Sequence, residues 1–182
     1  MKSPVKLLSL SLVVTIAMVA GCSTPASKSP EVTDSIRRSL DQSSLNDVKV
    51  SQDRDKGVVT LGGTVKSDAD KSQAESIAKS NAGGQVVADE IAVVPPGIES
   101  EAKAVNSDLD KGIDKNLDAA LIKAGLNKDV KYDVKNGVVT LTGDVNSPAK
   151  KARAEAVASK VPNVQQVVNE MELKNQKATS TN

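Results

Sequence analysis

The chain has 182 residues, with 24 basic and 23 acidic side chains, one tyrosine, one cysteine, and no histidine, tryptophan or phenylalanine. This composition lacks the usual zinc ligands, the usual pairs of nucleophile and base, and the aromatic platforms on which nucleic-acid bases stack, and the near-zero net charge is not typical of a nucleic-acid binder. We therefore expect a protein that is not an enzyme, that has no catalytic or metal-binding residues and no cofactor, and that does not bind nucleic acid.

The first 21 residues have the pattern of a secretory signal peptide. Lys2 and Lys6 precede an apolar run over residues 7–20, and small residues follow it. The run is too short for an ordinary membrane-spanning helix, so we predict that residues 1–21 are a signal peptide removed by cleavage before Cys22.

The residues around the predicted cleavage site point to a lipid anchor. The run Val19-Ala20-Gly21-Cys22 resembles the bacterial lipobox. This resemblance implies that Cys22 carries the lipid in a lipoprotein anchored to the membrane. Because Ser23 follows in place of an aspartate, the resemblance also implies the outer membrane, with the protein facing the periplasm.

An internal repeat sets the domain organisation. Residues 57–93 match residues 137–173 without a gap at 16 of 37 positions, which predicts two copies of one small module. The predicted segments are a flexible tether at 22–29, module 1 at 30–95, a linker at 96–104, module 2 at 105–174 and a disordered tail at 175–182.

Each module is predicted to open with an amphipathic helix. In module 1 the helix is expected to follow a Ser29-Pro30 cap, and in module 2 it is expected to run over 105–123. Apolar residues at helical spacing are expected to form the core face: Val32, Ile36 and Leu40 in module 1, and Val105, Leu109, Ile113, Leu117 and Leu121 in module 2. The acids beside them, Asp108, Asp110, Asp114 and Asp118, are expected to form a solvated face.

A hairpin is predicted next in both modules. In module 2 the dipeptide Asn136-Gly137 separates two alternating apolar runs, which indicates a two-residue turn. Module 1 has the longer connection 53–57, a charged turn whose spacing does not fit a calcium-binding loop.

Four glycines are assigned structural roles in the repeated strand and the turn before it. They are Gly57, Gly63, Gly137 and Gly143. Gly63 and Gly143 are expected on the core face, where a missing side chain lets a helix or another backbone pass close to the sheet.

The second half of each module is predicted to be a helix and a final strand. Ser67 and the pair Ser147-Pro148 are expected to cap these helices, and the last strands are expected at 86–94 and 164–173. The predicted fold class is α+β, with two tandem α-β-β-α-β modules, each a three-stranded sheet with two helices packed on one face.

Together, the lipobox, the tandem repeat, the Gly-Val-Val-Thr-Leu-x-Gly-x-Val strand and the alanine-rich second helix resemble the dual BON-domain (bacterial OsmY and nodulation) lipoproteins of the bacterial envelope. This resemblance covers nearly all of residues 30–174. It implies a non-catalytic protein that supports envelope integrity or the response to osmotic stress and that binds anionic phospholipid or envelope partners.

Two modes of binding follow as alternatives. In the first, the module contacts anionic phospholipid, and the candidate contacts are Lys150, Lys151 and Arg153 in the second helix of module 2, the more basic module. In the second, the lipid only places the protein at the membrane, and a sheet edge or the cleft between modules binds an envelope protein.

Overall fold

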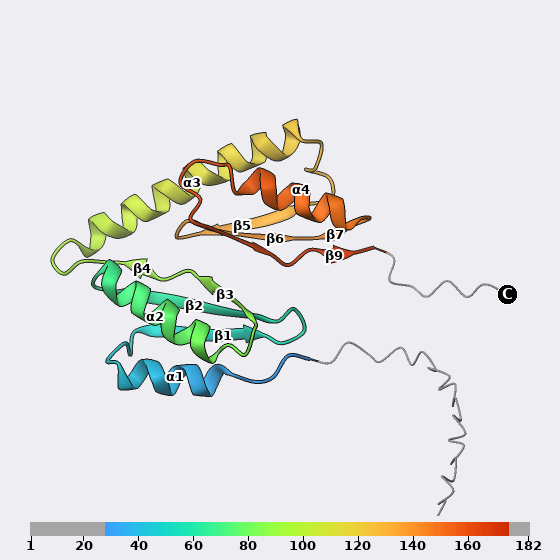
Figure 1. Cartoon of the computed structure of the whole chain (residues 1–182). Helices are drawn as coiled ribbons and strands as arrows, with labels where there is room; N and C mark the ends of the chain where they lie inside the picture. The colour runs from blue at the N-terminus through green and yellow to red at the C-terminus, as the bar shows by residue number, and fades with distance from the viewer. Residues whose placement is uncertain (1–27, 175–182) are drawn as a thin grey trace, which may run out of the picture.

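The computed structural model describes residues 28–174 and confirms the α+β class with two modules of like order (Figure 1). The elements of module 1 are α1 (Thr33–Gln42), β1 (Val48–Asp53), β2 (Val58–Val65), α2 (Asp68–Asn81), β3 (Val86–Asp89) and β4 (Ala92–Val93). Those of module 2 are α3 (Glu99–Lys123), β5 (Lys131–Lys135), β6 (Val138–Thr142), β7 (Asp144–Val145), α4 (Pro148–Ala158), β8 (Gln166–Asn169) and β9 (Glu172–Leu173). The predicted signal peptide, Cys22 and the tail 175–182 lie outside the described residues, as does nearly all of the predicted tether.

The two sheets have the same topology. In module 1, β2 pairs antiparallel with β1 and parallel with β3, and β4 extends the parallel pairing. In module 2, β6 pairs antiparallel with β5 and parallel with β8, and β7 pairs with β9. The modules lie one above the other, with α1 and α3 on opposite outer sides (Figure 1).

The final strand of each module is split, where the sequence predicted one continuous strand. In module 1 the Asp89 side chain accepts a hydrogen bond from the backbone N–H of Ile91 at 3.1 Å, and in module 2 Asn169 accepts one from Met171 at 3.4 Å. This side-chain hydrogen bond to the residue two positions later competes with the hydrogen bonds between strands, and it bends the chain between the two short strands.

Gly63 and Gly143 lie at the corresponding bend of the central strand. Their φ angles are +93° and +111°, and an added Cβ would lie 2.2 Å from the Asp47 carbonyl oxygen and 2.5 Å from that of Asp129. The backbone that passes close to the sheet is therefore the segment leading into the first strand.

The two hairpin connections differ as the sequence predicts. Asn136 and Gly137 both have positive φ, +48° and +79°, as a two-residue turn requires. In module 1 the Asp53 carboxylate accepts hydrogen bonds from the N–H groups of Asp55 and Lys56, each at 3.0 Å, which closes the longer charged turn.

Helix starts are predicted correctly at two of three caps. Ser67 and Ser147 each accept a hydrogen bond from the N–H three residues later, at 3.2 and 3.3 Å. The Ser29-Pro30 cap is wrong, because α1 begins at Thr33 without a side-chain cap. Ser29 instead donates its N–H to the Arg54 carbonyl at 2.9 Å, which holds this part of the chain along the hairpin loop.

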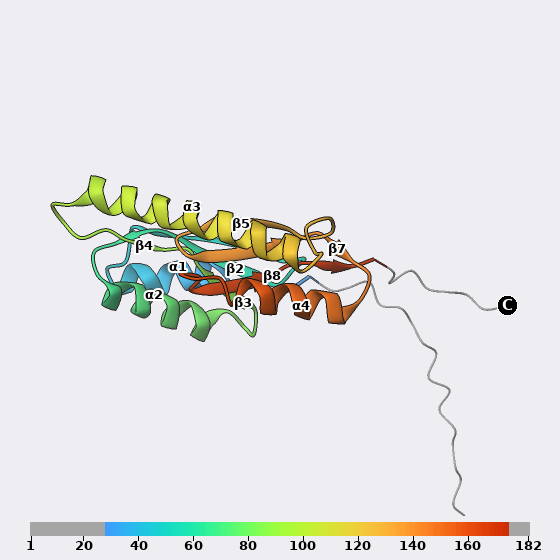
Figure 2. The ribbon, with the colours of Figure 1, turned by 90° about the horizontal axis from the view of Figure 1, so that it is seen from above.

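The start of α3 corrects two further predictions. The helix begins at Glu99, so residues 99–104 of the predicted linker are helical. Ile113 lies in the core as predicted, but Val105 and Leu109 are 57% and 44% exposed. The first turns of α3 extend past the sheet of module 2 and approach β4 of module 1 (Figure 2). The apolar side chains on these turns therefore lie outside the core of module 2.

Candidate binding surfaces

The modules dock through the sheet faces that point away from their helices. Val58 and Ala88 of module 1 pack with Val138 and Val168 of module 2 in one buried cluster, and each is at most 4% exposed. Val58 and Val138 are 80 residues apart in the sequence, as are Ala88 and Val168, so equivalent positions of the repeat meet at the interface. This interface buries the middle of one sheet face in each module, while Ser51 of β1 and Asp133 of β5 on the same faces remain exposed.

Polar groups fix the docking around this cluster. Gln166 of β8 donates its side-chain amide to the Val87 carbonyl at 2.7 Å and accepts from the Asp89 N–H at 3.0 Å. Two ion pairs flank it, Lys56 with Glu170 at 3.0 Å and Lys135 with Glu90 at 2.8 Å. These contacts connect the two modules on both sides of the apolar cluster.

Two ionisable groups at this interface have shifted pKa values. The hydrogen bond from Lys56 to Glu170 raises the pKa of the lysine. Burial raises the pKa of the Asp89 carboxyl, and this effect outweighs the opposing attraction of Lys71. Its counterpart in module 2 is the uncharged Asn169, so the two modules differ at this buried position.

The three basic candidates on α4 have different surroundings. Lys150 pairs with Asp129, and this contact lowers the pKa of the aspartate. Lys151 donates to the Met171 carbonyl at 2.8 Å, as the equivalent Lys71 does to Ile91 at 2.9 Å. Arg153 is exposed. The structure thus gives Lys150 and Lys151 partners within the fold and leaves the Arg153 side chain facing solvent.

One acid on the predicted solvated face of α3 has a structural role that the sequence analysis missed. The Asp110 carboxylate accepts hydrogen bonds from the N–H groups of Asn136 at 2.8 Å and Gly137 at 2.9 Å. It thereby attaches the hairpin to α3. The available signal was its spacing from Ile113, which places Asp110 on the side of the helix that faces the sheet.

Two clefts lie beside the contact between Asp110 and the hairpin. One, of about 410 Å³, is at the module junction between β4 and α3, and Leu109 and Lys71 are in its lining. The other, of about 560 Å³, is a groove between α3 and β5 that ends at Ala92 of module 1. Within residues 28–174 no cluster of acids suitable for a metal ion occurs, and no helix is both long and apolar enough to cross a bilayer.

Comparison with known proteins identifies the class. The BON domain model matches the chain twice, at residues 29–95 and 109–175, so the chain belongs to the BON-domain family. It is 31% identical over 137 residues to the osmotically-inducible protein Y of Escherichia coli K12, covering 74% of this chain and 67% of that protein.

Solved structures add a more distant likeness. Two structures of CdsD, a structural protein of the type III secretion system of Chlamydia trachomatis, align with 16% identity and TM-scores of 0.35 and 0.34. The alignments cover 76% and 77% of this chain and 90% and 96% of those chains. A TM-score this low carries no argument about this protein.

Proposed function

We propose that this protein is a lipid-anchored binding protein on the periplasmic side of the bacterial outer membrane, where it supports the envelope under osmotic stress. The similarity to an osmotically-inducible protein carries the stress role, and the lipobox-like run ending at Cys22 carries the anchor. The protein acts by binding rather than by catalysis, and the cell uses it as a scaffold for envelope proteins.

The geometry supports a scaffold because of where the surfaces lie. Docking buries the middle of one sheet face in each module, and the helices cover the other face. The surfaces left for a partner include the sheet edges and the grooves beside them, which are suited to peptide segments of other proteins.

Anchoring and the stress role are tested in cells. Wild-type protein should take up labelled palmitate and fractionate with the outer membrane, whereas Cys22→Ser should do neither. A deletion strain should lose viability after osmotic shock, and wild-type protein should restore it better than Cys22→Ser. Labelling of the serine variant, or full rescue by it, contradicts the anchored function.

Contact with anionic phospholipid is the second candidate, and the charge around α4 favours it. Lys150 and Lys174 both approach the single carboxylate of Asp129, which leaves an excess of positive charge beside the exposed Arg153. Each basic residue near an anionic surface contributes about 1 kcal/mol of binding.

Liposome sedimentation of the unlipidated full chain tests this contact. Binding to anionic vesicles should appear at low salt, weaken at high salt, and fall in Arg153→Glu, which leaves the Lys150–Asp129 pair intact. Arg38→Glu on α1 is the matched control with the same charge change. Equal binding by both variants, or no binding at low salt, contradicts the phospholipid contact.

A further inference from the structure

The outer edge of β5 presents backbone groups that point away from its sheet. Lys135 and Val138 flank the two-residue turn and so form a hydrogen-bonded pair. Bonded and non-bonded pairs alternate along an antiparallel ladder, so Tyr132 and Val134 direct their N–H and C=O groups outward. Within residues 28–174, no hydrogen bond from outside the ladder reaches these groups.

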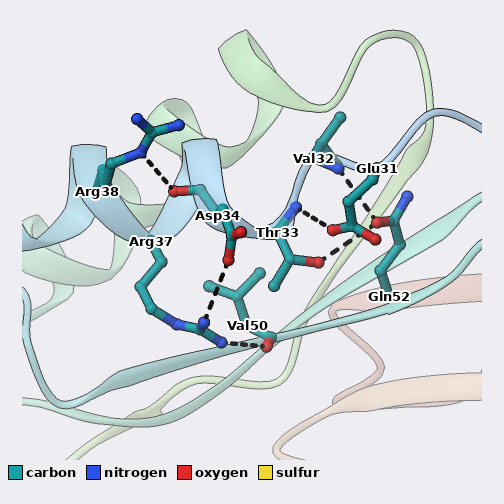
Figure 3. A network of polar contacts seen from close by, with 8 residues as sticks. All are labelled: Glu31, Val32, Thr33, Asp34, Arg37, Arg38, Val50 and Gln52. Atoms are coloured by element: carbon teal, nitrogen blue, oxygen red, sulfur yellow. Dashed lines mark hydrogen bonds and ion pairs between the residues drawn. The ribbon is translucent and has the colours of Figure 1, made fainter.

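The equivalent edge in module 1 is covered. Val50 pairs with Leu61 as Tyr132 pairs with Leu141 one repeat later, and its carbonyl accepts a hydrogen bond from the Arg37 guanidinium at 3.4 Å (Figure 3). Asp34 lies 3.7 Å from the same guanidinium. That Arg37 reaches the Val50 carbonyl shows that backbone groups at this register position face outward.

Further along β1, the Gln52 side chain holds the segment before α1 against this strand. Its oxygen accepts the Val32 N–H at 3.3 Å (Figure 3). The counterpart of Gln52 in module 2 is Val134, which cannot make this contact. The side chain that occupies an outward backbone group on the β1 edge is therefore Arg37.

Module 2 lacks the covering arginine. Arg37 lies three residues before the buried Leu40, and three residues before the equivalent Leu121 the chain has Asp118. A carboxylate cannot donate to a carbonyl, so the β5 edge stays uncovered.

The groove of about 560 Å³ runs directly beside this edge. Its lining includes four lysines, Lys103, Lys111, Lys115 and Lys135, and three aspartates, Asp110, Asp114 and Asp133. The charges along the groove are therefore nearly balanced. The feature that distinguishes this groove is the row of outward backbone donors and acceptors on β5.

We propose that this groove binds an extended peptide segment of a partner protein, which pairs with β5 as an additional antiparallel strand. An extended backbone is the ligand whose N–H and C=O groups repeat at the spacing of Tyr132 and Val134. The proposal rests on the scaffold function above and names its binding site and the kind of segment it takes.

The test is a titration of the isotope-labelled full chain with an end-blocked, uncharged peptide of eight alternating threonine and serine residues. Peptide binding should slow hydrogen exchange at the Tyr132 and Val134 amides, while those of Asp133 and Lys135 are protected in the free protein as well. A peptide N-methylated at alternate residues should not bind. Asp118→Arg, which copies Arg37, should weaken binding about tenfold, and Asp41→Arg on α1, with the same charge change, should not.

Three results would overturn the proposal. They are an absence of protection at Tyr132 and Val134 at millimolar peptide, equal binding of the N-methylated peptide, and dimerisation of the peptide-free chain that protects the same amides. The melting temperature of Asp118→Arg shows separately that the variant is folded, and the N-methylated peptide needs no variant. Failure here leaves the palmitate and osmotic-shock results unaffected, so the two proposals fail independently.

Discussion

The two modules share a fold but differ in what they expose. Where they face each other, the paired positions hold small apolar residues in both, Val58 with Val138 and Ala88 with Val168. At the outer edge, module 1 has Arg37 over its strand and module 2 has Asp118 at the same place. The comparison teaches that the two modules keep the same residue type, small and apolar, where they dock and differ at the outer edge, where an arginine bonds the β1 strand only in module 1.

The largest effect is expected at the bend that both modules share. In Gly63→Ala, the new Cβ would lie 2.2 Å from the Asp47 carbonyl oxygen, at a φ of +93°. We expect the free energy of unfolding to fall by about 4 kcal/mol, measured by urea denaturation. Gly143→Ala, with its closest contact at 2.5 Å, should cost somewhat less.

The neighbouring glycine is the control for this pair. Gly62→Ala adds a Cβ with nothing within 4 Å, so its cost should stay below about 1 kcal/mol. Equal costs at Gly62 and Gly63 would contradict the close approach of the backbone.

The next largest effect concerns the docking itself. Val168→Asp would place a carboxylate in the cluster where Val168 is 1% exposed, at a cost of about 3 kcal/mol. The modules should then separate and unfold in two transitions. The matched control is Val86→Asp, since Val86 is 50% exposed and its substitution should leave the unfolding profile unchanged. If Val168→Asp unfolds as the wild type does, the docked arrangement is wrong.

A smaller effect of opposite sign is expected at Asp89. Its Oδ1 already accepts from the Ile91 N–H, and an asparagine there could also donate, as Asn169 donates to the Lys151 carbonyl at 3.2 Å and to Glu155 at 3.0 Å. We expect Asp89→Asn to stabilise module 1 by about 1 kcal/mol at neutral pH.

The pH dependence of this gain has a definite sign. The charges facing Asp89 are Lys71, Glu75 and Lys79 on α2. Because burial raises the pKa of Asp89 above its ordinary value of 3.8, the folded state binds its proton more tightly, and stability falls as the pH rises through that raised pKa. The gain in Asp89→Asn should disappear below about pH 3.8 in thermal melts. A gain that persists unchanged at low pH would contradict the burial argument.

The smallest effect is expected at the ion pair between the modules. Lys56 and Glu170 are 30% and 15% exposed, so a double-mutant cycle with alanines should give a coupling energy of about 0.5 kcal/mol. The pair Lys111–Asp108, at 68% and 76% exposure, should give none. Glu170 raises the pKa of Lys56. The coupling between these two residues should therefore be present at neutral pH and be lost as the pH rises through the pKa of Lys56. Equal coupling in both pairs would contradict this reading.

The repeat and its periodicities were enough to predict the order of helices and main strands, the two-residue hairpin and the serine caps of α2 and α4, because these features depend on local sequence. The sequence did not reveal that Val105 and Leu109 are exposed, since their spacing matches a core face and only the position of the sheet shows that the helix extends past it. The same holds for Lys150 and Lys151, whose partners Asp129 and Met171 are about 20 residues away in the sequence. The open β5 edge requires both a register and a comparison with Arg37, which is a contact across elements.

The most direct test of the account is a methyl NOE spectrum of the full chain with labelled valine and alanine. Docking through the inner sheet faces predicts cross-peaks between the methyl groups of Val58 and Ala88 in module 1 and those of Val138 and Val168 in module 2. Their absence, with the contacts inside each module intact, would show that the modules are not docked in this way and would contradict the account.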